Sequence, residues 1–138
     1  MRVFIDANIL VSVLNKEFPL FTYSARILSL ADNKKFTLFT SPVCLAIAFY
    51  FAEKKCGTQL AKQKIASLTS KMQIANIGKR EIEKALADKM VNDFEDGMQY
   101  YAALENRCTA IITQDTEDYY YSTIKVLDAE EFLKAHVL

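Results

Sequence analysis

Glycine, proline, cysteine and histidine are all scarce in this sequence. Only three Gly and two Pro occur among 138 residues, so we expect short loops and many helices. The cysteines Cys44, Cys56 and Cys108 are odd in number and show no CxxC spacing, and the one histidine is His136. This set argues against a structural zinc site. Cys44 and Cys108 have apolar neighbours and are predicted to be small core residues.

Net charge is also lacking, because 17 basic residues balance 17 acidic ones. Global charge therefore does not indicate a strongly basic nucleic-acid binder, although it leaves a local basic patch open. No apolar run is long enough to span a bilayer. Asp6 stands where a signal peptide would need an apolar stretch. We expect a cytoplasmic protein without a membrane partner.

The rest of the composition is that of an ordinary globular protein, with 51% hydrophobic and 25% charged residues. The length suits one domain with one hydrophobic core. No Gly/Ser linker, charge block or repeat divides the chain. Residues 1–138 are therefore predicted to form a single domain.

Strand-like and helix-like segments alternate along the chain. Strands are predicted at 3–5, 36–39, 72–77, 109–113 and 125–127, and helices at 9–14, 22–31, 43–55, 59–72, 80–89, 96–106 and 129–135. Such alternation predicts an α/β fold, with a mainly parallel sheet of about five strands and helices on its faces.

Some helix ends are marked by particular residues. Ser41 and Pro42 form a strong start signal, with Ser as N-cap and Pro at the first helical position. Gly57 is expected to end this helix, and Asp128 to cap the last one. Residues 43–55 are apolar nearly all round, which predicts a buried helix.

Acidic residues stand at the ends of two strands and at the start of a helix. Asp6 directly follows the first strand, and Asp115 follows the fourth strand by one residue. Asp93 and Asp96 precede or open the helix that leads into the fourth strand. Ligand sites in open α/β sheets lie beyond the carboxyl ends of strands. If the first and fourth strands are neighbours, these acids converge.

Clustered carboxylates repel one another, and burial disfavours their charged form. A cation stabilises such a cluster, and oxygen ligands suit Mg²⁺ or Mn²⁺. A bound ion of this kind can activate water and orient a phosphodiester. The sequence contains no GxSxG, Walker loop or GxGxxG that would indicate a competing chemistry.

Each acid also has a purely structural interpretation. Asp6 alone could be an N-cap, Asp96 an acid favoured by the helix dipole, and Asp118 a turn residue. The run Tyr119 to Tyr121 is more typical of packing than of stacking on bases. The joint pattern favours a site.

Four segments resemble the motifs of PIN domains, as in VapC-type toxins. They are, in the order that the family has them, VFIDANIL, TSPVCLAIAF, NDFEDGMQYYAAL and ITQDTEDYY. The resemblance implies a three-layer α/β/α fold and metal-dependent cleavage of RNA. It also implies a cognate antitoxin and a homodimer.

The resemblance also implies roles for individual residues. The catalytic metal ligands are expected to be Asp6, Asp96 and Asp115, with Mg²⁺ or Mn²⁺ as cofactor. Supporting residues are expected at Asn8, Asp93, Thr113 and Asp118. Of these, Asn8 and Thr113 would orient carboxylates or water, and Asp118 is the second choice to Asp115.

The sequence departs from the family at one position. PIN nucleases usually carry a Glu in the helix after the second strand, about where Ile47 stands. Glu53, the one acid in that helix, lies six residues on, roughly 240° around the axis at about 100° per residue. It is a poor substitute, and this puts catalytic activity in question more than the fold.

Three functions therefore compete. The first is a metal-dependent endoribonuclease, the toxin of a toxin–antitoxin pair. The second is a PIN-like module with a degraded site that binds RNA or protein. The third, a phosphoacceptor or phosphatase-like domain using Asp6, lacks a DxDxT pattern.

Two surface features are candidates for contact with partners. The side chains that could hold an RNA backbone are Lys54, Lys55, Lys62 and Lys64, with Lys34 and Lys35 as further candidates. A solvated helix face is the commoner role of any single lysine. The apolar segment 18–30 is predicted to be core, with a dimer or antitoxin groove as the alternative.

Overall fold

Five parallel strands form one sheet at the centre of the computed structural model, which describes residues 1–137. The strands are β1 (Arg2–Ile5), β2 (Thr37–Thr40), β3 (Gln73–Ile74), β4 (Ala110–Ile112) and β5 (Lys125–Leu127). Their order across the sheet is β3-β2-β1-β4-β5, and every pairing is parallel. The predicted α/β class and strand number are confirmed.

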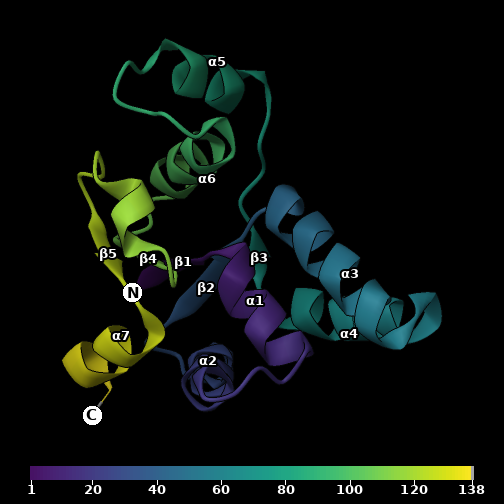
Figure 1. Cartoon of the computed structure of the whole chain (residues 1–138). Helices are drawn as coiled ribbons and strands as arrows, with labels where there is room; N and C mark the ends of the chain where they lie inside the picture. The colour runs from purple at the N-terminus through teal and green to yellow at the C-terminus, as the bar shows by residue number, and fades with distance from the viewer. Residues whose placement is uncertain (138) are drawn as a thin grey trace.

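Helices cover both faces of the sheet. They are α1 (Ala7–Leu14), α2 (Leu20–Ser29), α3 (Pro42–Cys56), α4 (Thr58–Lys71), α5 (Lys79–Ala87), α6 (Phe94–Glu105) and α7 (Ala129–His136), with 3₁₀ turns at Leu30–Asp32 and Thr116–Tyr119. Figure 1 shows α5 and α6 on one side of the sheet and α1, α2 and α7 on the other, with α3 and α4 extending past β3. The fold is a three-layer α/β/α arrangement.

The two central strands form the heart of the core. Val3, Phe4 and Ile5 of β1 are fully buried, and so are the three residues of β4, Ala110 to Ile112. Strands covered on both faces are expected to be continuously apolar, as these are. In the register Phe4 lies opposite Ile111 and Ile5 opposite Ile112. The residues that follow the two strands therefore emerge side by side.

The predicted helix-end signals are confirmed. The Ser41 side chain accepts a hydrogen bond from the Cys44 amide at 3.0 Å, with Pro42 at the first helical position. Asp128 caps α7 through the Glu131 amide at 2.8 Å. These polar groups satisfy backbone N–H groups that the helices leave without partners.

The predicted burial of the helix after β2 is wrong in part. Its small residues Ala48 and Ala52 are fully buried, whereas Tyr50 and Phe51 are 51% and 45% exposed. Helix α3 packs on α1 and α4, so its remaining aromatic side reaches solvent. Such exposure of large apolar side chains is compatible with a binding surface.

Three further expectations can be compared with the structure. Cys44 and Cys108 are buried, as predicted. The third strand is shorter than predicted, only Gln73–Ile74. Within residues 1–137, no helix combines the length and apolarity that a membrane crossing requires.

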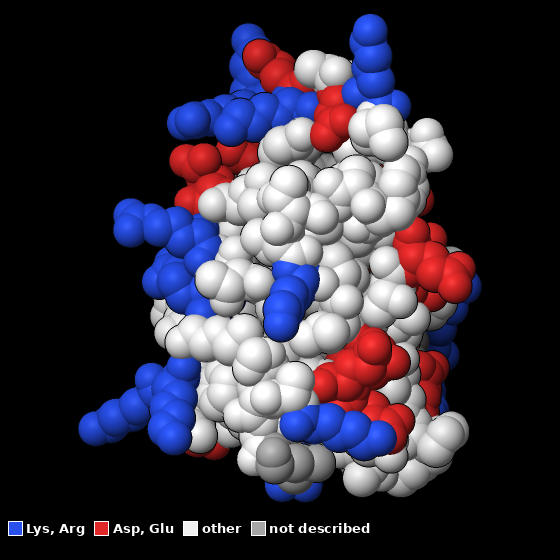
Figure 2. All heavy atoms as spheres, turned by 90° about the vertical axis from the view of Figure 1, so that its left-hand side faces the viewer, with Lys and Arg blue, Asp and Glu red and all other residues white. Residues whose placement is uncertain are grey.

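Charges on the β5 side of the molecule lie mostly around its margin, and one basic side chain stands near the centre of the face. Figure 2 shows this face, with acidic and basic groups around its margin. Several Lys and Arg side chains, together with acidic ones, stand at the top, over α5. No continuous basic tract crosses the part of this face that the structure describes.

Gly57 ends α3 in a backbone conformation that favours glycine, with φ of 85° and ψ of 166°. We predict that Gly57→Ala lowers the free energy of unfolding by about 1–3 kcal/mol, because this region is essentially reserved for Gly. The measurement is urea unfolding followed by circular dichroism.

Gly78→Ala is the matched control for this change. Gly78 has φ of −115°, and an added Cβ would meet only an ordinary contact at 3.7 Å. A loss for Gly78→Ala as large as that for Gly57→Ala would contradict the prediction.

Candidate active site

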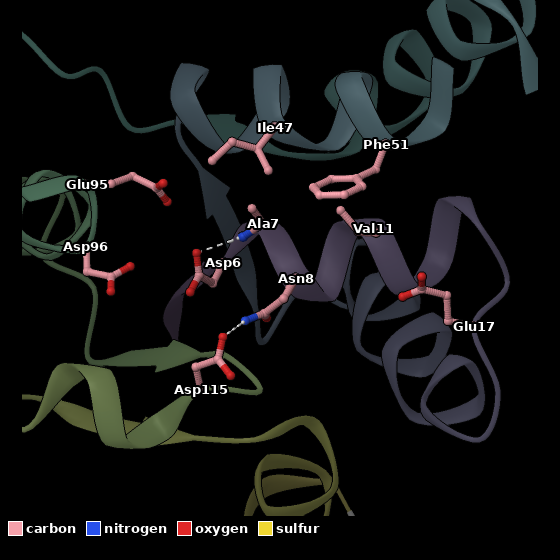
Figure 3. A pocket seen from close by; sticks show the side chains of 10 residues that line it. All are labelled: Asp6, Ala7, Asn8, Val11, Glu17, Ile47, Phe51, Glu95, Asp96 and Asp115. Atoms are coloured by element: carbon pink, nitrogen blue, oxygen red, sulfur yellow. Dashed lines mark hydrogen bonds between the residues drawn. The ribbon is translucent and has the colours of Figure 1, made fainter. Parts of the chain in front are cut away.

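A pocket opens where the strand order reverses. Chain connections run from β1 through β2 to β3 and then return to β4 and β5, so the reversal lies between β1 and β4. Ligands bind at such a switch point, beyond the carboxyl ends of the strands. A pocket of about 310 Å³ lies there, lined by Asp6, Asp96 and Asp115 among others (Figure 3). The predicted convergence of these acids is present.

Asp6 is held from three sides. Its Oδ1 accepts from the Ala7 amide at 2.8 Å, while its Oδ2 accepts from Thr113 Oγ1 at 2.9 Å and from the Tyr119 hydroxyl at 3.1 Å. The residue is 5% exposed. Asp6 is therefore an N-cap, as its structural interpretation proposed, and also a fixed acid within the pocket.

Thr113 connects the ends of β1 and β4. Besides donating to Asp6, its hydroxyl accepts from Asn8 Nδ2 and from the Asp115 amide, each at 3.1 Å. Asn8 Nδ2 also donates to Asp115 Oδ2 at 3.1 Å, and Asn8 Oδ1 accepts from the Gln114 amide. The expected orienting role of Asn8 and Thr113 is supported by these contacts.

Asp96 enters the pocket from the first turn of α6. Its side chain is 9% exposed, and its carboxylate has no hydrogen bond or ion pair with any part of residues 1–137. Burial, followed by the negative charges of Asp93 and Asp6, raises the pKa of Asp96 to about 7. A largely buried acid without a protein partner is costly to the fold, even where its oxygens open onto a pocket.

Burial also raises the pKa of three other ionisable groups in and beside the pocket. Burial raises the pKa of Asp6, although the hydrogen bonds from Thr113, Ala7 and Tyr119 act in the opposite direction. Burial, followed by the charges of Asp6 and Asp93, raises the pKa of Glu95. Burial and the Asp6 charge raise the pKa of the Cys44 thiol to about 12, so this thiol stays protonated. The pocket therefore concentrates negative charge.

Two predicted supporting acids lie outside the pocket lining. The Asp93 side chain accepts from the Asp96 amide at 3.1 Å and caps α6. Asp118 is exposed and lies with Asp115 around a neighbouring hollow. Asp115 also lines the main pocket, whereas Asp118 does not; the preference for Asp115 as a ligand stays a prediction.

The four lysines predicted to bind RNA do not line the pocket. Lys55 donates to the Asn15 carbonyl and Lys64 to the Leu14 carbonyl, so both bind the carboxyl end of α1. Lys54 lies 4.3 Å over the ring of Tyr50. These contacts give Lys54, Lys55 and Lys64 structural roles, while Lys62 is exposed.

Three residues in or beside the pocket were not singled out from the sequence. Glu95 and Glu17 line the pocket, and Tyr119 is buried against Asp6. Glu95 directly precedes Asp96, so its place in the third motif was an available signal. Tyr119 packs, as the tyrosine run predicted, and its hydroxyl also reaches the site.

The opposite wall is apolar. Ile47 and Phe51 of α3 and Val11 of α1 line it, and Figure 3 shows Ile47 above Ala7 and Asp6. Position 47 therefore faces the site itself. An apolar residue stands where the family resemblance led us to expect an acid.

The donor set suits a hard divalent cation in its chemistry. Four carboxylates, Asp6, Glu95, Asp96 and Asp115, lie toward one end of the pocket, Glu17 lies at the other end, and none of the ten lining residues is basic. Within the described chain, no three Asp, Glu, His or Cys side chains are close enough together to hold one ion. Mg²⁺ commonly keeps several waters and takes only one or two protein carboxylates. The residues present fit an ion held in that way.

Comparison with known proteins agrees with this geometry. The sequence pattern of the PIN domain matches residues 2–117. The chain belongs to the PIN domain family. It is 30% identical over 135 residues to Ribonuclease VapC1 of Aquifex aeolicus, covering 95% of this chain and 92% of that protein.

Solved structures share the fold of this PIN domain. The sarcin-ricin loop cleaving toxin VapC20 of Mycobacterium tuberculosis aligns with a TM-score of 0.70 at 15% identity, over 90% of this chain and 98% of that one. A toxin–antitoxin complex from Klebsiella pneumoniae aligns with a TM-score of 0.69 at 19% identity, over 92% of this chain and 97% of that one. VapBC2 of Rickettsia felis, bound to a promoter DNA fragment, aligns with a TM-score of 0.69 at 17% identity, over 93% of this chain and 98% of that one.

The Thr113 hydroxyl gives a first test of how this PIN domain organises its site. We predict that Thr113→Val lowers the free energy of unfolding by about 1–3 kcal/mol, because buried groups lose their partners, and also weakens Mn²⁺ binding. Thr40→Val removes another fully buried hydroxyl, which donates to the Ile5 carbonyl at 2.9 Å. The Thr40→Val variant should lose stability but keep its affinity for Mn²⁺. Equal Mn²⁺ affinities for the two variants, measured by calorimetry, would show that the Thr113 hydroxyl does not organise the metal site.

The unpartnered carboxylate of Asp96 gives a second test. Asp96→Asn removes a buried charge that its neighbours repel, so we predict a rise on the order of 1 kcal/mol in the free energy of unfolding with chelator at pH 8. Asp32→Asn is the control, because it breaks only an exposed pair with Lys71 at 3.5 Å and should change little. A destabilised Asp96→Asn protein in chemical denaturation would contradict the prediction.

Proposed function

We propose that this PIN domain is a Mg²⁺- or Mn²⁺-dependent endoribonuclease and the toxin of a toxin–antitoxin pair. The observation that carries the proposal is the acidic pocket at the switch point of the sheet, where Asp6 and Asp96 are buried and Asp115 completes the rim. Such a pocket attracts a cation. The similarity to Ribonuclease VapC1 supports RNA as the substrate.

The proposed ligands are Asp6, Asp96 and Asp115, with at least one of them reaching the ion through a bound water. A divalent ion in this pocket would lower the pKa of water and orient the scissile phosphodiester. Thr113 and Tyr119 hold the Asp6 carboxylate, and Asn8 holds that of Asp115. Acids fixed in this way need no rearrangement when the ion and the phosphate enter.

RNA contacts outside the pocket are proposed at two places. Phe51, 45% exposed on the pocket rim, offers a ring on which an unpaired base can stack. Lys62, together with Lys54, Lys55 and Lys64, would meet the phosphate backbone weakly, since three of these side chains already contact protein groups.

A cognate antitoxin and a second copy of the chain are proposed as partners in the cytoplasm. Segment 18–30 both packs and faces outward: Ile27 is fully buried, whereas Phe18 is 71% exposed. A hollow of about 260 Å³ involves Pro19, Leu20 and Tyr23. This segment is the part of the molecule that we assign to partner contact.

A second candidate function follows from Ile47. If the acid missing at that position is essential, the domain binds RNA or protein without cutting. Mn²⁺ titration separates the two functions, since only a nuclease site needs the ion.

The decisive experiment is cleavage of a mixed RNA pool by the purified chain with Mn²⁺, with Mg²⁺ and with chelator. We expect metal-dependent cutting that Asp96→Asn reduces by at least about 100-fold and that Asp32→Asn retains. Absence of cutting by folded, antitoxin-free protein would favour the binding module.

A further inference from the structure

The site of this chain lacks an acid where its family usually has one. Ile47 projects from α3 into the pocket lining, so the position has not turned away from the site. Glu53, the acid of α3, accepts from the Thr58 hydroxyl at 2.8 Å and does not line the pocket. The missing carboxylate, if it is replaced at all, has to come from another element.

Glu95 reaches the same part of the pocket from α6. It precedes Asp96 and is partly buried. Figure 3 shows its carboxylate pointing into the pocket, between Asp96 and Ile47. Helix α6 stands on the opposite side of the sheet from α1 (Figure 1). Glu95 from α6 and Asp6, which caps α1, therefore reach one space from two directions.

An ordinary first-turn role does not explain this orientation. An acid in the first turn of a helix is stabilised by the dipole while it stays solvated. Glu95 instead lies near the negative charges of Asp6 and Asp93, and no Lys or Arg within residues 1–137 forms an ion pair with it. Its position costs free energy that a bound cation would offset.

The adjacent Asp96 points to a ligand independently. The residue is 9% exposed and lines the pocket, and its carboxylate receives no hydrogen bond in the described chain. Polar groups of largely buried residues usually have protein partners, whereas this carboxylate opens onto the pocket. Two consecutive residues of α6 thus bring unpaired carboxylates to the same pocket.

We propose that Glu95 replaces, from α6, the carboxylate that PIN nucleases usually carry on the helix after the second strand, and that it helps Asp96 and Asp6 to hold the divalent ion, directly or through the waters that the ion keeps. This inference rests on the proposed function. Ile47 then serves as an apolar wall, since a second acid there would add repulsion.

Glu17 provides a matched control. It also lines the pocket but stands at the far end, beyond Asn8 and Val11 in Figure 3, and it is exposed. Glu95→Gln and Glu17→Gln remove the same charge from the two ends of one pocket. Only the first should matter for the ion.

The test is Mn²⁺ binding to the full chain, measured by calorimetry and by electron paramagnetic resonance, with circular dichroism to verify folding. We expect Glu95→Gln to weaken Mn²⁺ affinity by at least about tenfold, a loss typical even of residues that only orient ligands. Glu17→Gln should bind Mn²⁺ as the wild type does. Equal affinities for wild type and Glu95→Gln would overturn the inference, and Glu95→Ala repeats the test if the Gln variant misfolds.

A rescue variant tests whether a carboxylate at position 47 and one at position 95 are interchangeable. Ile47→Glu in the Glu95→Gln background returns the carboxylate to α3 and should restore Mn²⁺ affinity and RNA cleavage. Failure of this double variant to regain Mn²⁺ affinity, while folded, would count against replacement.

Failure of the inference and failure of the proposed function give different results. If wild-type protein binds Mn²⁺ and cuts RNA while Glu95→Gln does so equally well, only the inference fails. If the wild-type protein neither binds Mn²⁺ nor cuts, both fail.

Discussion

The parallel pairing of β1 with β4 determines where every acid of the site lies. It places Ile5 opposite Ile112, so Asp6 and Thr113 leave the sheet side by side and their side chains meet at 2.9 Å. The chain changes direction across the sheet between these two strands, which leaves the pocket open above them. Helix α6 then leads into β4 and brings Asp96 to the same place.

The acids that suit this pocket to bind a cation also lower the stability of the fold. Thr113 and Tyr119 stabilise the buried Asp6 carboxylate, whereas Asp96 is buried with no such partner in the described chain. Uncompensated charge of this kind is tolerated where it serves a ligand. The apolar core under the pocket, formed by β1 and β4, holds the acids in place despite their repulsion.

Much of the fold was predictable because its signals are local. Ser41-Pro42, Gly57 and Asp128 mark helix ends through contacts within a few residues. The apolar runs of β1 and β4 reflect burial on both faces. The prediction failed where contacts between elements decide, as for α3, whose aromatic side reaches solvent because α1 and α4 occupy its other sides.

The sequence by itself determined the parallel α/β class, the helix ends and the acids at the strand ends, because hydrophobic period and capping act over short distances. It also showed the anomaly at Ile47. Only the tertiary structure decided that Lys55 and Lys64 bind carbonyls of α1, that Tyr119 reaches Asp6, and that Glu95 shares the pocket with Ile47. These facts depend on how separate elements pack, and packing brings together residues that no spacing along the chain relates.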